Sequence, residues 1–235
     1  MTFATDRLDH LLLVDALTPD QISGLFAWYD MSKLGLANND AITAVSDLSG
    51  SGFDLTTPAS DPVFHTDVSN GLGAAWFTSD ADRRLDSSTF TGVGTPGMVI
   101  GVASCATASA GWVLFDGQGS SNRWNCGASG SGTTNFSLFA GGAGPAISTG
   151  TFSLSVFVAL FNSSNSMLWR EVDNTWATDG NAGTNSLTGI RIARHQTTTT
   201  RRFNGYIGEL AYYNRRLRPD EFTPLVASLQ AKWGI

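Results

Sequence analysis

The sequence predicts an all-β fold: a two-sheet antiparallel jelly-roll sandwich, with a short N-terminal helix and a C-terminal helix packed on it. The first observation is composition, because only 14% of the 235 residues are charged, while 42% are hydrophobic and 26 are glycine. Long helices need more Glu, Lys and Ala than this, whereas short strands joined by tight turns suit the mixture. The second observation is that alternating apolar segments recur along the chain, and the third is that helical spacing appears clearly only at the C-terminus.

The N-terminal region predicts an arm followed by one domain. Residues 1–17 are weakly patterned and form the expected arm, and residues 18–235 form the expected jelly-roll domain. Thr18 as N-cap and Pro19 in the first helical position predict a short helix that Gly24 interrupts. The four apolar residues at 11–14 are too few for a secretory signal, and no stretch approaches the 18 apolar residues of a membrane span. We therefore expect a soluble chain that is not exported by such a signal.

The middle of the chain predicts strands. Its segments are rich in β-branched and aromatic residues, and each is bounded by Gly, Asn, Ser or Asp, which is typical of strands in a sandwich. The predicted strands are 97–104, 111–116, 135–140, 151–161, 166–172, 187–194 and 205–213.

The C-terminus predicts a helix with one apolar stripe. The residues at helical spacing are Phe222, Leu225, Val226, Leu229 and Trp233. Thr223 is the expected cap, Pro224 fits the first turn, and Gly234 ends the helix.

Four segments resemble a known family. The stretch "FNGYIGELAYYNRRLRPDEFTPLVASLQAKWGI" (203–235) resembles the closing segment of concanavalin A-like lectin/glucanase domains, which include laminin G-like modules. The matching positions are Phe203, Gly205, Ile207, Glu209, Tyr213, Arg215 and Leu217. The stretches "GLFAWYDMSKLG" and "SDLSGSGFDL" look like the start of such domains in bacterial and tailed-phage proteins, and "NGLGAAWF" (70–77) resembles the next strand. The resemblance covers about residues 19–235 and implies a jelly roll of two antiparallel sheets.

The residues needed for hydrolysis are sparse. A retaining glycosidase needs two carboxyl groups about 5–5.5 Å apart, which neighbouring positions on one strand face can supply. Glu171 and Asp173 are the single candidate pair, whereas Glu209 has no acidic residue two positions away and is expected to be structural. None of the three histidines lies in a nucleophile motif. The sequence therefore predicts that the chain is not an enzyme.

The loop "SDLSGSGFDL" (46–55) raises the question of calcium. Asp47 and Asp54 are its only carboxylates, and the position where a calcium loop needs a bidentate Glu is Pro58. Gly50 and Gly52 can adopt positive φ, and Asp47 can bond its own backbone. We expect a turn and no cofactor, with calcium at Asp47 and Asp54 as the alternative.

Two polar stretches have the composition of a sugar site, in which an aromatic face is surrounded by hydrogen-bonding groups. The candidate glycan-binding residues are Asn122, Arg123, Trp124 and Asn125 in one stretch, and Asp173, Asn174 and Trp176 in the other, with Trp169 beside them. The alternative is that the tryptophans are packing residues, as most tryptophans are.

The net charge limits the classes of expected partner, and the two cysteines raise the question of a disulfide. A net charge of −6 and a pI of about 4.9 argue against a nucleic-acid partner. Cys105 and Cys126 can form one disulfide or stay free, and a reducing cytosol favours free thiols.

The expected function follows from the resemblance. A stand-alone domain without a signal peptide, resembling phage versions of the fold, predicts a non-catalytic phage virion component: a capsid decoration, head-fibre or tail-associated protein on the virion surface. Residues 1–17 would then contact neighbouring virion subunits, and a homo-oligomer is compatible with that role. The alternative is a carbohydrate-binding lectin that recognises glycans, and a third candidate is a glycoside hydrolase.

Overall fold

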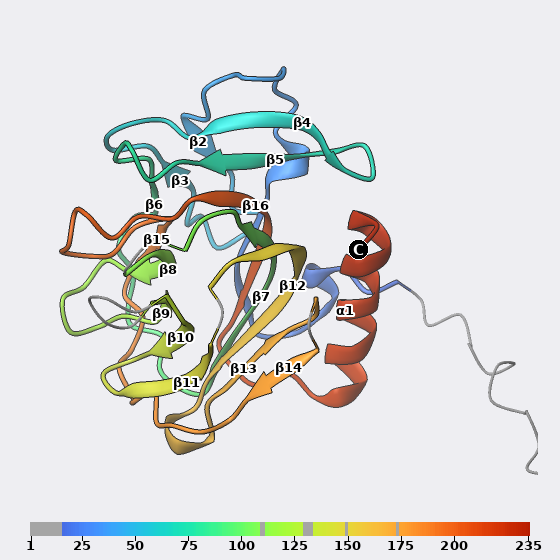
Figure 1. Ribbon diagram of the computed structural model, residues 1–235. Helices are drawn as coiled ribbons and strands as arrows, with labels where there is room; N and C mark the ends of the chain where they lie inside the picture. The colour runs from blue at the N-terminus through green and yellow to red at the C-terminus, as the bar shows by residue number, and fades with distance from the viewer. Residues whose placement is uncertain (1–15, 109–110, 129–133, 149, 173) are drawn as a thin grey trace, which may run out of the picture.

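The computed structural model describes residues 16–108, 111–128, 134–148, 150–172 and 174–235. Two antiparallel eight-stranded sheets face each other, which confirms the predicted two-sheet sandwich (Figure 1). The expected arm, residues 1–17, lies outside the described residues except for Ala16 and Leu17. None of the helices in the described ranges is long and apolar enough to cross a membrane.

The first sheet has the order β14-β13-β12-β7-β16-β5-β4, with β1 also paired to β16. Its strands are β1 (Leu25–Asp30), β4 (Val63–Ser69), β5 (Leu72–Phe77), β7 (Gly97–Cys105), β12 (Phe152–Phe161), β13 (Met167–Arg170), β14 (Thr175–Ala177) and β16 (Gly205–Tyr213). The start of β16 pairs with β5 and its end pairs with β1. The first and last long strands of the chain are therefore neighbours.

The second sheet has the order β11-β10-β9-β8-β15-β6-β3-β2. Its strands are β2 (Ala44–Val45), β3 (Leu55–Thr56), β6 (Leu85–Asp86), β8 (Val113–Gly117), β9 (Asn125–Gly127), β10 (Phe136–Phe139), β11 (Ala143–Ile147) and β15 (Ile190–Ile192). Every predicted strand overlaps one of the observed strands, and 205–213 matches β16 at both ends.

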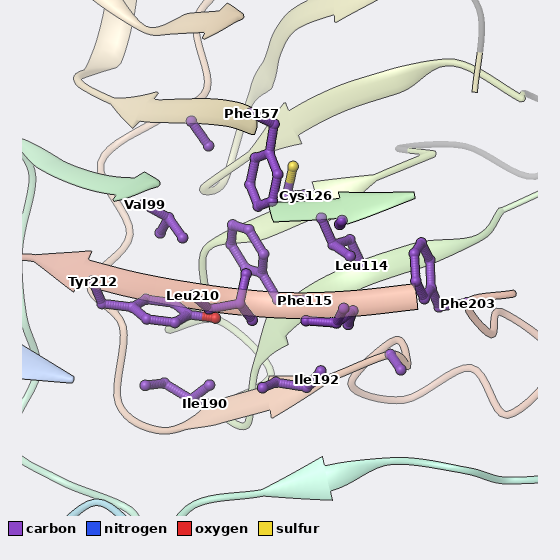
Figure 2. Close-up of a cluster of buried hydrophobic side chains, with 14 of the residues drawn as sticks. Val99, Leu114, Phe115, Cys126, Phe157, Ile190, Ile192, Phe203, Leu210 and Tyr212 are labelled. Atoms are coloured by element: carbon purple, nitrogen blue, oxygen red, sulfur yellow. The ribbon is translucent and has the colours of Figure 1, made fainter. Parts of the chain in front are cut away.

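The core between the sheets explains the alternation in the sequence. Phe157, Leu210 and Tyr212 from the first sheet meet Phe115 and Ile192 from the second (Figure 2). Both cysteines are buried free thiols. Burial of such aromatic and branched side chains is the main favourable term in folding.

The outer face of the first sheet carries a second apolar layer, covered by α1 (Pro219–Trp233) (Figure 1). Leu225, Leu229 and Trp233 of the predicted stripe are buried against β7 and β12 side chains such as Ile100 and Val158. The helix ends at Gly234, which has a φ of 65° as expected for a C-terminal glycine cap.

The start of α1 differs from the prediction of a Thr223 cap. The helix begins at Pro219, because the Glu221 carboxylate reaches back to accept from the backbone N–H of Arg218 at 2.9 Å. Pro224 therefore lies inside the helix rather than in its first turn. The predicted N-terminal helix is a single 3₁₀ turn, η1 (Pro19–Gln21), in which Gln21 accepts from the backbone N–H of Thr18 at 2.8 Å. Two further turns are η2 (Met31–Lys33) and η3 (Ser163–Asn165).

Candidate carbohydrate site

The loop 46–55 is a turn held by its own carboxylates. Asp47 accepts from the backbone N–H groups of Trp28 and Ser49, both at 2.9 Å, and from Phe53 at 3.1 Å. Asp54 accepts from the backbone N–H of Asp47 at 2.7 Å. These bonds tie the loop to β1 and occupy both carboxylate oxygens of Asp47 and one of Asp54. Within the described ranges, no three His, Cys, Asp or Glu side chains are grouped to hold a metal ion.

The first predicted glycan set is drawn into the protein. Trp124 is fully buried, stacks on Phe161 at 5.2 Å between ring centroids, and donates its indole N–H to the Asn185 carbonyl at 2.8 Å. Gly97 makes room for the ring, because a Cβ at that position would lie 1.9 Å from it. No face of Trp124 is open for a sugar to stack on.

The neighbours of Trp124 take part in a polar network that includes Asp116 on β8 and His195 in the segment after β15. Asn125 is buried, and Arg123 pairs with buried Asp116 at 3.1 Å and contacts His195 Nε2 at 2.9 Å. Burial raises the pKa of Asp116 to about 6, although the Arg123 charge opposes the shift. Burial and then the Arg123 charge lower the pKa of His195 to about 4. Of this set, only Asn122 has an exposed position.

The second predicted set lies at the surface, on the hairpin of β13 and β14. Trp169 and Trp176 are direct cross-strand partners, and their ring centroids are 5.6 Å apart. Trp169 is only 8% exposed, whereas Trp176 is 47% exposed. The Asn174 side chain accepts from the Trp169 indole at 3.3 Å, so it holds the inner ring in place. Asp173 lies outside the described residues.

A cleft of about 100 Å³ opens beside Trp176, between the β13–β14 hairpin and the start of α1. We call it the Trp176 cleft. Its walls include Leu160, Met167, Trp176, Arg216 and Phe222. Phe222 lies 6.4 Å from Trp176 between ring centroids, and the cleft surface is mostly apolar. Such a surface suits the apolar face of a sugar ring.

A second space of about 320 Å³, the polar cavity, adjoins the cleft, because Met167 and Arg216 line both. Its other lining residues are Asn162, Ser164, Asn165, Ser166 and Thr178. The two spaces together combine an aromatic wall with amide, hydroxyl and guanidinium groups, which is the general design of a small polar ligand site. The polar members come from the β12–β13 connection, which includes η3, and from the segments after β14 and β16. None of them stands out in the sequence alone.

A pair of buried carboxylates lies at the other end of α1. Asp30 and Glu209 are cross-strand partners on β1 and β16, and both accept from Lys232 Nζ, at 2.6 and 2.5 Å. Glu209 also accepts from the indole N–H of Trp28 at 2.8 Å. Burial, and then repulsion from Asp30, raise the pKa of Glu209. A cavity of about 240 Å³ is lined by both carboxylates and Trp28. The pair is not visible along the sequence, because its two members lie on different strands that only the fold brings together.

No protein-family model and no curated protein matches the sequence. Among solved structures, the chain is similar to domain 4 of AbnA, a GH43 extracellular arabinanase from Geobacillus stearothermophilus, in complex with arabinotriose. The TM-score is 0.57 at 13% identity, over 86% of this chain and 98% of that domain. An arabinofuranosidase complexed with arabinofuranosyl-α-1,2-xylobiose gives a TM-score of 0.58 at 11% identity, over 82% of this chain and 51% of that one.

These similarities correct two expectations. At such identities they establish the β-sandwich fold alone, and the chain spans only about half of the arabinofuranosidase. The structures nevertheless belong to arabinose-directed glycosidases, a finding that contradicts the predicted phage virion component and favours carbohydrate binding, the alternative drawn from the sequence. The prediction that the chain is not an enzyme is contradicted by the same finding. The resemblance to concanavalin A-like domains holds at the level of the sandwich.

Proposed function

We propose that residues 18–235 form one carbohydrate-binding domain of the concanavalin A-like type, with its ligand in the Trp176 cleft and the adjoining polar cavity. The observation that carries the proposal is Trp176, which is half exposed and supported from behind by Trp169 and Phe222. A rigid aromatic face of this kind stacks on a sugar ring with little loss of entropy. The near-complete overlap with a domain that was solved with arabinotriose supports the same role.

The direct test is calorimetric titration with arabinotriose and retention on an arabinan gel. The substitution Trp176→Ala should weaken arabinotriose binding by about tenfold or more, because loss of an aromatic anchor costs about 2 kcal/mol of binding free energy. The matched control is Val172→Ala, since Val172 is 46% exposed on the same hairpin and lines neither space. Equal binding by wild type and the Trp176 variant would refute this site, and thermal melting checks that both variants fold.

Glycoside hydrolysis is a second candidate function, favoured by the Asp30–Glu209 pair. The two carboxylates share one ammonium, so their bound oxygens lie no farther apart than the carboxyls of a retaining glycosidase, about 5–5.5 Å. A raised pKa is also what a general acid requires. If the pair is catalytic, the chain releases reducing sugar from arabinan and Asp30→Asn abolishes that release, whereas Asp20→Asn on exposed η1 leaves it unchanged. Absence of release by the wild-type protein would eliminate this candidate.

A further inference from the structure

The segment that joins β16 to α1 carries three arginines with different surroundings. Arg215 forms two hydrogen bonds to Glu221, both at 2.8 Å, and Arg218 pairs with Asp220 at 3.2 Å. The Arg216 side chain has no hydrogen-bond or ion-pair partner anywhere in the described part of the chain. The arginine left unpaired is the one that lines both the Trp176 cleft and the polar cavity.

Arg216 is exposed, and no protein group in the described part of the chain pairs with its charge. The side chains that line the polar cavity are amides, hydroxyls and a thioether, and among the described lining residues of both spaces none is acidic. A cation at the junction of a polar and an aromatic surface attracts an anionic ligand group, and its planar guanidinium matches a carboxylate with two parallel hydrogen bonds.

We propose that the sugar bound in the Trp176 cleft carries a carboxylate, as uronic acids and sialic acids do, and that Arg216 binds it. This inference rests on the proposed function, because the aromatic wall holds the ring while Arg216 selects the acid. Asn162, Asn165 and Thr178 then supply hydrogen bonds for hydroxyl groups at the polar end. This role gives a reason why Arg216, unlike Arg215 and Arg218, forms no ion pair at the start of α1.

The test compares ligands that differ only in charge. Trigalacturonic acid and its methyl ester have the same rings and hydroxyls, and sialyllactose and its methyl ester serve as the second pair. For whichever acid the cleft fits, wild type should bind the acid about tenfold or more tightly than its neutral partner, as expected for a charge-assisted bond. The preference should weaken at high salt because screening reduces it. The pair that shows the preference identifies the source of the carboxylate.

Variants then assign the preference to one side chain. Arg216→Gln should bring the acid and its neutral partner to within about twofold of each other, and Arg216→Lys should keep part of the difference. Arg218→Gln is the matched control, because Arg218 is an exposed arginine of the same segment that lines neither space. Both positions are at the surface, and thermal melting confirms folding.

Each outcome separates the two proposals. Equal affinity of wild type for acid and neutral partner, or a preference that survives Arg216→Gln, overturns the acidic-sugar inference. Tight binding of arabinotriose without any binding of the acids also overturns it, while the carbohydrate site at Trp176 stands. Failure of every sugar to bind overturns both.

Discussion

At the scale of single residues, Lys232 links α1 to two strands of the first sheet. Its ammonium is bonded to Asp30 on β1 and Glu209 on β16, while its own backbone belongs to α1. Both carboxylate side chains are almost fully buried, so each depends on this cation and on neighbouring N–H groups for compensation. Removing the Lys232 ammonium would leave the two buried carboxylates without their cation, and an uncompensated buried charge is strongly destabilising.

Lys232→Met should therefore lower the free energy of unfolding by about 2 kcal/mol or more at neutral pH, and the loss should shrink in acid as the Glu209 carboxyl, whose pKa is raised by burial, becomes protonated. Urea denaturation at pH 7 and pH 4 measures both effects. Lys33→Met is the control, since Lys33 is 56% exposed in its side chain and stands 3.9 Å from Asp30, and it should cost less than about 1 kcal/mol. A Lys232 variant as stable as wild type would show that the carboxylates are compensated without the ammonium.

At the scale of elements, the contact between α1 and β16 depends on a missing side chain. A Cβ on Gly208 would lie 2.6 Å from the ring of Trp233, which is fully buried. The absence of a side chain on Gly208 therefore leaves the space that the Trp233 ring occupies at the last turn of α1. The sequence pattern matched in the closing segment leaves position 208 unspecified, so only the packing shows what the glycine is for.

Gly208→Ala should lower the free energy of unfolding by about 1–3 kcal/mol, because the added methyl group forces Trp233 or the strand to move. Gly94→Ala is the matched control, since a Cβ there meets nothing within 4 Å. Urea denaturation followed by tryptophan fluorescence measures both variants. If the two substitutions cost the same, Trp233 does not depend on this close approach.

The elements also show what the sequence could predict. Alternation identified the long strands, such as β16, because each has one face in the core and the other under α1 or toward solvent. Two-residue strands such as β2 and β6 have too few positions for a period to appear. Trp176 was found because a tryptophan in a polar stretch is conspicuous, and its place at the site remains a prediction. Arg216 and Asn162 were missed because only the fold brings their segments together.

At the scale of the whole molecule, the dependence of stability on pH combines two opposed groups in the Asp116 network. Folding raises the pKa of Asp116 from its ordinary 3.8 to about 6, so between these values the folded state holds the extra proton and stability falls as pH rises. Folding lowers the pKa of His195 from its ordinary 6.5 to about 4, so over nearly the same range the unfolded state holds the extra proton and stability increases with pH. The two contributions offset each other between about pH 4 and 6.

Single substitutions should expose the separate slopes. His195→Gln leaves the Asp116 contribution, so stability relative to wild type should fall as pH rises from 4 to 6, whereas Asp116→Asn should give a relative rise. Urea midpoints at several pH values across this range provide the measurement, and only the change with pH is compared because either substitution also alters the Arg123 contacts. Two variants with profiles parallel to wild type would show that neither group titrates anomalously.

The pairing of β1 with β16 also bears on how the protein is made. Trp28 and Glu209, bonded across these strands, are separated by 181 positions in the sequence. The ribosome therefore synthesises β1 long before its partner strand β16. The apolar side chains of β1 remain exposed until β16 has been made. Contacts of such long sequence separation slow folding and prolong the exposure of unpaired edges. The sandwich can close only after β16 has been synthesised, and the edge of β1 remains unpaired until then.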